Sequence, residues 1–241
     1  MLDLVIACIN RPEDWHFWSR KSDLLQRLPL LRSLLLVGPS RILERRRGGL
    51  CQVQGPQAFS KSMALRTGAT LARSEWLMFL DSDLRISPGV LQQLHSACLA
   101  GAPRRCVHLA RVVESERRLR AATFSGYRPV LFWSAHGRPQ LRLEAWSSEG
   151  WRPGFGNLML PRKLYAAIGG HDPVYTHYGW EDHDLLISLS LAGADVQSLG
   201  QACHRTHGDE QRHLIAGNRL ASVRRMRAVF EAKFRALLEK G

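Results

Sequence analysis

Two aspartates follow an apolar run in the segment FLDSDL, residues 79–84. Asp81 and Asp83 would end a buried strand, where an uncompensated charge is costly. Carboxylates at such a point are suited to holding a hard divalent cation, and such a cation usually shares its ligand shell with substrate phosphates. The alternative is a turn in which the aspartates accept backbone hydrogen bonds. The segment by itself leaves both open.

Two histidines lie three positions apart in the segment CHRTHGDE. Neutral imidazole can complete the ligand shell of Mn²⁺ or a similar ion that carboxylates already hold. A dedicated zinc site is disfavoured because no cysteine pair with matching spacing accompanies the histidines. Structural histidines are the alternative. We predict a metal site built from Asp83 together with His204 or His207.

A third segment, HYGWEDHDLL, opens a predicted helix with several acids. Acidic residues in a first helical turn favour the helix dipole and supply a cap, which accounts for one or two of them. The glycine and Trp180 before them suggest an exposed aromatic ring at a flexible joint, suited to stacking on a sugar. A carboxylate beside that ring, Glu181 or Asp182, could act as general base toward an acceptor hydroxyl. Asp184 receives only the helix-turn role.

Strands and helices alternate along the chain around these segments. This alternation predicts an α/β fold with a parallel, doubly wound sheet covered by helices. Ligands bind such sheets at the carboxyl ends of the strands, so Asn10–Arg11 and Asp81–Asp83 should face one cleft. Apolar runs predict strands at 2–9, 31–38, 50–55, 75–84, 154–161 and 195–200, and helical spacing predicts helices at 13–28, 58–72, 87–100, 162–170, 181–194 and the last ~25 residues.

Two regions give a weaker pattern. The basic stretch 41–49 is expected to be a solvated loop or helix. Residues 104–152 contain one predicted strand, CVHLARVV, followed by a basic and aromatic region that the pattern does not assign.

Composition narrows the class of protein. The chain has 34 basic and 21 acidic residues and a formal net charge of +13, which suggests an anionic partner: nucleic acid, a membrane surface or a phosphorylated ligand. Five cysteines without a CxxC pair fit a reducing compartment. No segment reaches the ~18 apolar residues of a membrane span, so we expect a soluble cytoplasmic protein. The P-loop, dinucleotide-binding and serine-hydrolase motifs are absent from the sequence.

The segments, in this order, resemble those of the GT-A glycosyltransferases, particularly the inverting β1,4-galactosyltransferase and bacterial chondroitin-polymerase-like group. CINRPEDWHFW resembles the opening loop of that group, AFSKSMALRTGATLA its first helix after the donor loop, and FLDSDL its D-x-D strand end. GFGNLMLPRKLYAAIGGHD, GWEDHDL and HRTH are similar to its later signatures. The resemblance runs from about residue 5 to 210 and is interrupted across 104–150.

The resemblance implies a GT-A fold: a mostly parallel central sheet flanked by helices in a single domain. Residues 1–210 would form the catalytic domain, with the nucleotide-sugar-binding half at 1–103 and the acceptor-binding half at 104–210. Residues 211–241 would form an amphipathic, basic helix packed on that domain or extending it.

The resemblance also implies an activity and its cofactor. A hexose of the galactose or N-acetylhexosamine type would pass, with inversion, from a UDP-sugar to a hydroxyl of a glycan or lipid-linked acceptor, with Mn²⁺ or Mg²⁺ required. The protein could associate peripherally with the inner face of an anionic membrane, and no nucleic acid is expected as a partner.

Site roles follow from the same resemblance. Asp182 would be the catalytic base, and Trp180 and Glu181 would bind the acceptor. The metal ligands would be Asp83, His207 and His204. The donor-binding residues would be Arg11 and Phe59 at the uridine, Lys61 at the diphosphate, Asp81 near the ribose or metal, and Ser82 and Gly156.

Two other classes of protein fit parts of the pattern. A basic nucleic-acid-binding protein would account for the charge, and a metal-dependent nucleotide-processing enzyme such as a nucleotidyltransferase would account for the acids and histidines. The nucleic-acid-binding protein does not explain why acids cluster at the ends of predicted strands, so we rank it below the transferase.

Overall fold

The computed structural model describes residues 1–8, 12–20, 28–38, 44–47, 50–54, 60–207 and 218–238. Its main feature is a nine-stranded sheet in the order β3-β4-β2-β1-β5-β10-β7-β11-β6, with a separate β8–β9 hairpin. The sheet strands are β1 (Leu2–Ala7), β2 (Leu31–Gly38), β3 (Glu44–Arg47), β4 (Leu50–Gln54), β5 (Trp76–Asp81), β6 (Leu84–Arg85), β7 (Arg105–Glu114), β10 (Trp151–Pro161) and β11 (Asp195–His204). The hairpin strands are β8 (Thr123–Trp133) and β9 (Pro139–Glu149).

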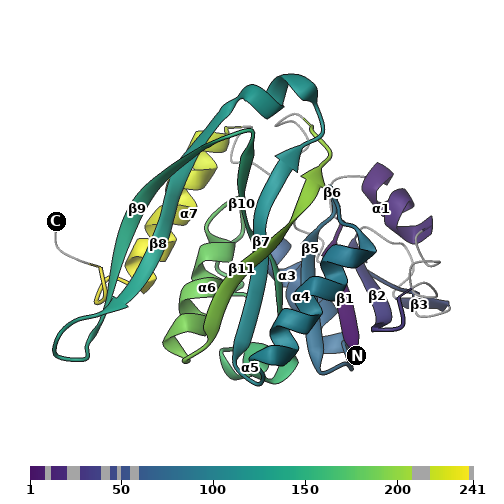
Figure 1. Cartoon of the computed structure of the whole chain (residues 1–241), viewed down its shortest axis with the longest axis horizontal. Coiled ribbons are helices and arrows are strands. Elements are labelled where there is room, and N and C mark those ends of the chain that lie inside the picture. Colours follow the sequence, from purple (N-terminus) through teal and green to yellow (C-terminus); the bar gives the residue numbers. More distant parts are fainter. Residues whose placement is uncertain are drawn as a thin grey trace.

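Helices cover the sheet on both faces (Figure 1). They are α1 (Pro12–Ser19), α3 (Lys61–Leu71), α4 (Pro88–Ala100), the 3₁₀ helix η2 (Arg117–Ala121), α5 (Arg162–Ala167), α6 (Glu181–Leu191) and α7 (Arg219–Lys233). Among the described residues, no helix is both long enough and apolar enough to cross a membrane.

The sheet is mixed. β4, β2, β1 and β5 run parallel to one another, β10 is antiparallel to both β5 and β7, and β11 is parallel to β7. The predicted α/β fold is therefore confirmed, but the sheet is parallel mainly in its N-terminal half. The reason is topological: β10 follows the hairpin directly, without a crossover helix to return the chain to the same edge.

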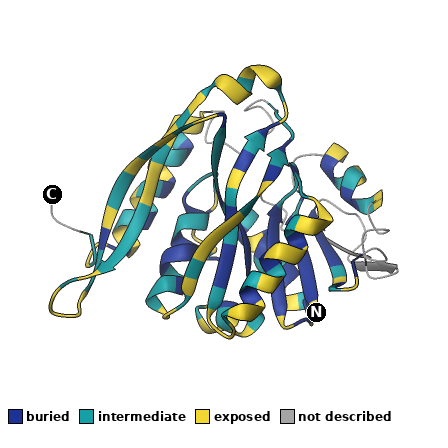
Figure 2. Ribbon diagram, in the orientation of Figure 1, coloured by how far each residue is buried: buried dark blue, intermediate teal, exposed yellow. Residues whose placement is uncertain are grey.

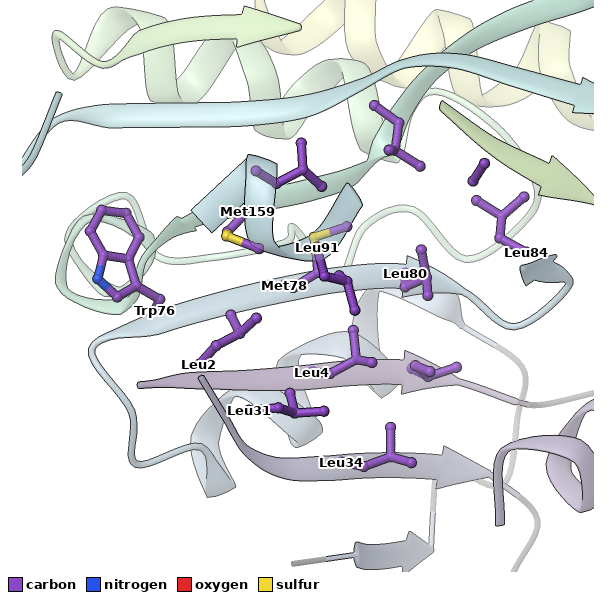
Figure 3. Packing of buried hydrophobic residues seen from close by; sticks show 14 of the residues in the cluster. Leu2, Leu4, Leu31, Leu34, Trp76, Met78, Leu80, Leu84, Leu91 and Met159 are labelled. Atoms are coloured by element: carbon purple, nitrogen blue, oxygen red, sulfur yellow. The ribbon is translucent and has the colours of Figure 1, made fainter. Parts of the chain in front are cut away.

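The central strands β1, β2 and β5 are largely apolar because both of their faces are buried. The buried Asp3 of β1 is an exception, and it accepts hydrogen bonds from the Arg73 and Ser74 amides. Side chains alternate between the faces: Leu4, Leu34 and Met78 pack in one cluster (Figure 3), while Val5 and Phe79 pack in another on the opposite face. Burial is greatest in β1, β2 and β5, and the hairpin is far more exposed (Figure 2).

A third apolar cluster joins the hairpin to the end of the chain. Helix α7 lies alongside β8 and β9 (Figure 1), and its Met226 and Phe230 pack against Leu141 of β9 and Trp180. The apolar face of this predicted amphipathic helix is thus buried in the middle of the helix, at Met226 and Phe230. Its first turn differs, because Leu220 is 56% exposed.

One prediction of secondary structure was wrong, and the structure adds detail to two others. The basic stretch 41–49 contains strand β3, which pairs antiparallel with β4 at the edge of the sheet. The unassigned region 104–152 forms β7 and the hairpin. The predicted helix 13–28 is a helix at Pro12–Ser19, and residues 21–27 lie outside the described residues.

Candidate active site

The carboxyl ends of the central strands carry the first group of acids. Asp81 ends β5 and pairs in parallel register with Ala7, the last residue of β1. The two strand ends therefore meet, but Asn10 lies outside the described residues, so the predicted cleft between Asn10–Arg11 and Asp81–Asp83 stays a prediction. Arg11, which follows β1, and Phe59, which precedes α3, both lie outside the described residues.

Lys61 joins three acids from separate parts of the chain. Its Nζ lies 2.9 Å from Asp81 Oδ1, 3.3 Å from Glu181 Oε1 and 3.2 Å from Asp182 Oδ1. Burial lowers the pKa of Lys61, but Asp182, Asp81 and Glu181 outweigh it and raise the pKa well above its ordinary value. Ser60 positions this lysine by capping α3, because its Oγ accepts a hydrogen bond from the Met63 amide.

Asp182 is a carboxyl group whose charge is disfavoured by its surroundings. Burial raises its pKa to about 7; Lys61 opposes the rise, and Glu181 and Asp81 add to it. A base whose pKa lies near neutrality is well matched to taking a proton from a hydroxyl. Asp182 is thus the acid of this segment with the character of a general base.

Gly156 makes room for the Asp182 carboxylate. A Cβ atom at position 156 would lie 2.3 Å from Asp182 Oδ2, so any side chain on this residue of β10 would displace the acid. The predicted donor-binding role of Gly156 is untested by this contact, which instead explains why a glycine is needed there.

Asn157 fixes Asp81 and was missed from the sequence. Its Nδ2 donates to Asp81 Oδ2 at 3.1 Å, and its Oδ1 accepts from the Asp81 amide at 2.8 Å. Asn157 is buried. The available signal was an amide side chain inside the otherwise apolar segment GFGNLMLP, since buried polar groups are normally hydrogen-bonded.

A second group of side chains converges on Asp83. Its Oδ2 lies 3.2 Å from His204 Nε2 and 3.0 Å from His207 Nε2, and one ligand atom from each residue falls within 4.8 Å of the others. His204 ends β11 and pairs with Leu84 of β6, so the short antiparallel pairing brings the histidine beside the D-x-D turn. The structure thus unites the three residues that the sequence suggested as metal ligands.

Glu114 supports this cluster from behind and was also missed. It ends β7, opposite His204 of the parallel strand β11, and its Oε2 lies 2.6 Å from His204 Nδ1. Burial raises the pKa of Glu114, but the hydrogen bond from His204 and the charges of His204 and Arg152 lower it to about 2. A carboxylate on the outer ring nitrogen orients the imidazole so that its inner nitrogen faces a metal.

The donor set fits a divalent cation. One carboxylate and two imidazoles are ligands that Mn²⁺ accepts, and three protein ligands leave positions for substrate oxygens. Burial lowers the pKa of His204, but its hydrogen bonds to Asp83 and Glu114 raise it overall. A group that attracts a proton in this way also attracts a cation, and the cation would displace that proton.

Ser82 has a structural contact. Its Oγ lies 3.3 Å from Oδ2 of Asp14, a buried residue of α1, and its carbonyl accepts a hydrogen bond from Trp18 Nε1 at 2.8 Å. These contacts tie the D-x-D turn to α1. Ser82 also lines the cavity described below, so its predicted donor-binding role stays a prediction.

Trp180 is not exposed as predicted. It is 7% exposed and packs against Phe230 and His183 at centroid distances of 5.0 Å. Its backbone is left-handed, with φ of 72°, which turns the chain into α6 and carries the ring into the third apolar cluster. The burial arises because α7 covers this face. Glu181 is buried as well, and its Oε2 has no hydrogen-bond partner among the described residues.

Asp184 is not a surface acid of the helix turn. It is buried, and its Oδ2 accepts a hydrogen bond from Tyr175 Oη at 2.8 Å and pairs with Lys233 Nζ at 2.8 Å. Lys233 also pairs with Asp172 at 2.8 Å. The start of α6, which carries Asp182, is therefore fastened to the last turn of α7.

Replacing Lys233 with methionine should lower the free energy of unfolding by about 1–3 kcal/mol, because the buried Asp184 carboxylate loses a charged donor. Urea denaturation would measure the change. Arg235→Met, an exposed substitution just after the same helix, is the matched control and should shift stability by less than about 0.5 kcal/mol. Equal effects of both substitutions would contradict this role for Lys233.

Both groups of side chains line one cavity of about 420 Å³. Lys61, Asp81, Asp83, His207 and Asp182 all line it. Residues of the hairpin, the 178–180 loop and the start of α7 form the remaining wall. Two side chains suited to holding a cation, Asp83 and His207, thus line the same cavity as a carboxyl group whose pKa lies near neutrality.

Two family profiles match consecutive parts of the chain. That of Glycosyl transferase family 2 matches residues 40–144, and that of the N-terminal domain of galactosyltransferase matches residues 137–210. None of the curated proteins matches the chain in sequence.

Solved structures share the fold. A crystal structure of GalNAc-T7 with UDP, GalNAc and Mn²⁺ matches with a TM-score of 0.58 at 13% sequence identity. The matched part covers 86% of this chain and 44% of the GalNAc-T7 chain. Glucosyl-3-phosphoglycerate synthase from Mycobacterium tuberculosis, crystallised with Mn²⁺, UDP and glucosyl-3-phosphoglycerate, matches with a TM-score of 0.56 at 16% sequence identity. The matched part covers 97% of this chain and 79% of the synthase chain. In fold and in sequence pattern, this chain is similar to the GT-A glycosyltransferases.

The chain spans 44% of the length of the GalNAc-T7 chain. At these identities the likeness to both structures is one of fold. The resemblance that the sequence segments predicted is confirmed by the profiles and by the fold together.

Proposed function

We propose that this glycosyltransferase moves a hexose, with inversion, from a UDP-sugar to a hydroxyl of a glycan or lipid-linked acceptor in a metal-dependent reaction. The observation that carries the proposal is the shared cavity, which holds Asp182 together with Asp83 and His207. Residues 1–103 would bind the nucleotide sugar, and 104–210 the acceptor.

Asp83, His204 and His207 would hold the cation, and Mn²⁺ accompanies UDP in both solved structures. When bound, it would supply positive charge next to the diphosphate of the departing UDP. Glu114 would keep His204 oriented, and Asn157 would keep Asp81 beside Lys61.

The acceptor oxygen would attack the anomeric carbon as the bond from that carbon to the diphosphate oxygen breaks. The electron pair of this bond leaves with UDP. The acceptor proton passes to a carboxylate oxygen of Asp182. Lys61, which bridges Asp81 and Asp182, would offer its charge to the diphosphate. One base and a single displacement support inversion at the anomeric carbon.

The pH dependence of kcat/KM should report Asp182. A base must be deprotonated to accept a proton, so kcat/KM should fall about tenfold per pH unit below pH 7 and level off above it, in line with a pKa of about 7. Initial rates of UDP release at saturating Mn²⁺ would show this limb. The residual activity of Asp182→Asn should not show this fall in kcat/KM below pH 7. If the fall persists in that variant, it reports the titration of another group.

The function is tested by thermal unfolding with a panel of nucleotide sugars, with and without Mn²⁺. A donor present at 100 times its Kd should add about 2.7 kcal/mol of stability, and only when Mn²⁺ is present. Product analysis then separates the reaction classes: a glycosyltransferase releases UDP, whereas a nucleotidyltransferase would release pyrophosphate. Protection by no UDP-sugar would contradict the proposal.

Peripheral association with an anionic membrane is part of the same proposal. Arg224 and Arg225 are exposed on α7, on the side away from Met226 and the third apolar cluster. Each Lys or Arg side chain near an anionic membrane surface contributes about 1 kcal/mol to the free energy of membrane binding. Co-sedimentation with phosphatidylserine vesicles should therefore fall in the Arg224→Glu, Arg225→Glu double variant. Unchanged co-sedimentation, or none by the unaltered protein, would contradict it.

A further inference from the structure

The cavity contains aromatic side chains that the predicted acceptor site did not include. Trp180 also lines the cavity, but its ring packs against Phe230 and it is only 7% exposed, so it offers little surface to a sugar. Trp146 and Tyr127 of the hairpin and Tyr178 of the loop before α6 line the same cavity as Asp182.

Trp146 is held as a fixed surface. A Cβ atom at Gly126, its partner across the hairpin, would lie 3.1 Å from three atoms of the indole ring. The absence of a side chain at this position lets the ring rest on the backbone of β8. An aromatic ring fixed in this way offers its surface at a low cost in conformational entropy.

Cations from α7 stand over the other rings. The guanidinium of Arg219 lies 5.6 Å from the centroid of Tyr178, and that of Arg227 lies 5.1 Å from the centroid of Tyr127. Both distances are within the range of a cation–π interaction. Helix α7, which lies alongside β8 and β9 (Figure 1), thus contacts two of the aromatic rings that line the cavity.

A pyranose ring fits this combination of groups. It presents carbon-bound hydrogens on its faces, which suit the negative face of an aromatic ring, and hydroxyls at its edge, which suit guanidinium and phenol groups. Ligand sites are generally of this kind, with apolar and aromatic walls and a few polar groups that set orientation.

We infer that Trp146 and Tyr178 form the platform that binds a pyranose ring of the acceptor, so that the hairpin and α7 determine acceptor choice. Calling this sugar the acceptor rests on the proposed function. The pyranose ring would lie in the same cavity that the base Asp182 lines.

Saturation-transfer NMR would test the platform with three named probes: the methyl β-glycosides of glucose, galactose and N-acetylglucosamine, each with UDP and Mn²⁺. Irradiation of the aromatic protons should give a signal for at least one glycoside. Titration of the same glycoside into Trp146→Ala or Tyr178→Ala should give a Kd about tenfold higher than for the unaltered protein, as expected for loss of one aromatic anchor.

Trp133→Ala is the matched control. This tryptophan is on the same strand pair, is 59% exposed and is not among the described residues that line the cavity, so its loss should leave the affinity unchanged. Absence of signal from the unaltered protein would overturn the inference, and so would equal weakening by Trp133→Ala.

Calorimetric titration of UDP with Mn²⁺ separates this inference from the proposed function. Trp146→Ala should bind UDP as the unaltered protein does, because the donor end of the cavity is untouched. If the unaltered protein fails to bind UDP but still binds the glycoside, the proposed function is refuted and the inference of a sugar-binding platform stands. Loss of UDP binding in Trp146→Ala would overturn the platform.

Discussion

Replacing Asp182 with asparagine is expected to lower kcat by about 10²–10⁴-fold, the usual contribution of a general base. The amide has nearly the same shape as the carboxylate and can still accept a hydrogen bond from Lys61, but it cannot take the acceptor proton. Lys61 keeps Asp81 and Glu181 as partners, so the fold around it should persist. Steady-state UDP release would measure the loss.

Binding measurements make this prediction specific. Calorimetric titration of Asp182→Asn with UDP and Mn²⁺ should give an affinity within about twofold of the unaltered protein, because the metal cluster is elsewhere in the cavity. Asp195→Asn removes a half-exposed carboxylate that pairs with Arg105 and should leave kcat unchanged. Near-normal turnover of Asp182→Asn would show that another group is the base.

Replacing Asp83 with alanine is expected to abolish Mn²⁺-dependent binding of UDP. Asp83 is the carboxylate on which both histidines converge, so its loss removes the negative charge that holds the cation. Loss of an outer-shell partner typically costs 10–100-fold in metal affinity, and loss of this direct ligand should exceed about 10²-fold. Titration of Mn²⁺ in the presence of UDP would measure it.

A graded series strengthens the assignment. Glu114→Gln should weaken Mn²⁺ binding by about 10–100-fold, because it removes the charge that orients His204. His136→Ala, in the exposed turn of the hairpin, should have no effect. An unchanged titration for Asp83→Ala would show that the cation, if bound, is held by other residues.

Local pattern was enough to predict several parts of this protein. Apolar runs that end in acids gave β5 followed by its D-x-D turn, and the acidic start of α6 was visible in GWEDHDL. The three metal-cluster residues were recognisable by type and spacing. These features depend on chain periodicity and on the chemistry of single side chains, both of which are written in consecutive residues.

Only the tertiary structure decided which side chains meet. Lys61 and Asp182 are 121 positions apart, Glu114 and His204 are 90 apart, and Asp81 and Asn157 are 76 apart. Their contacts depend on strand order and register, which bring distant segments to one sheet edge.

The position of Trp180 has the same kind of cause. Its sequence neighbours predict an exposed ring, but α7 packs over it from more than 40 positions away in the chain. Burial is a property of packing between elements rather than of local sequence. The aromatic wall of the cavity follows from that packing too, because residues of the hairpin and the 178–180 loop face one cavity only once α7 is in place.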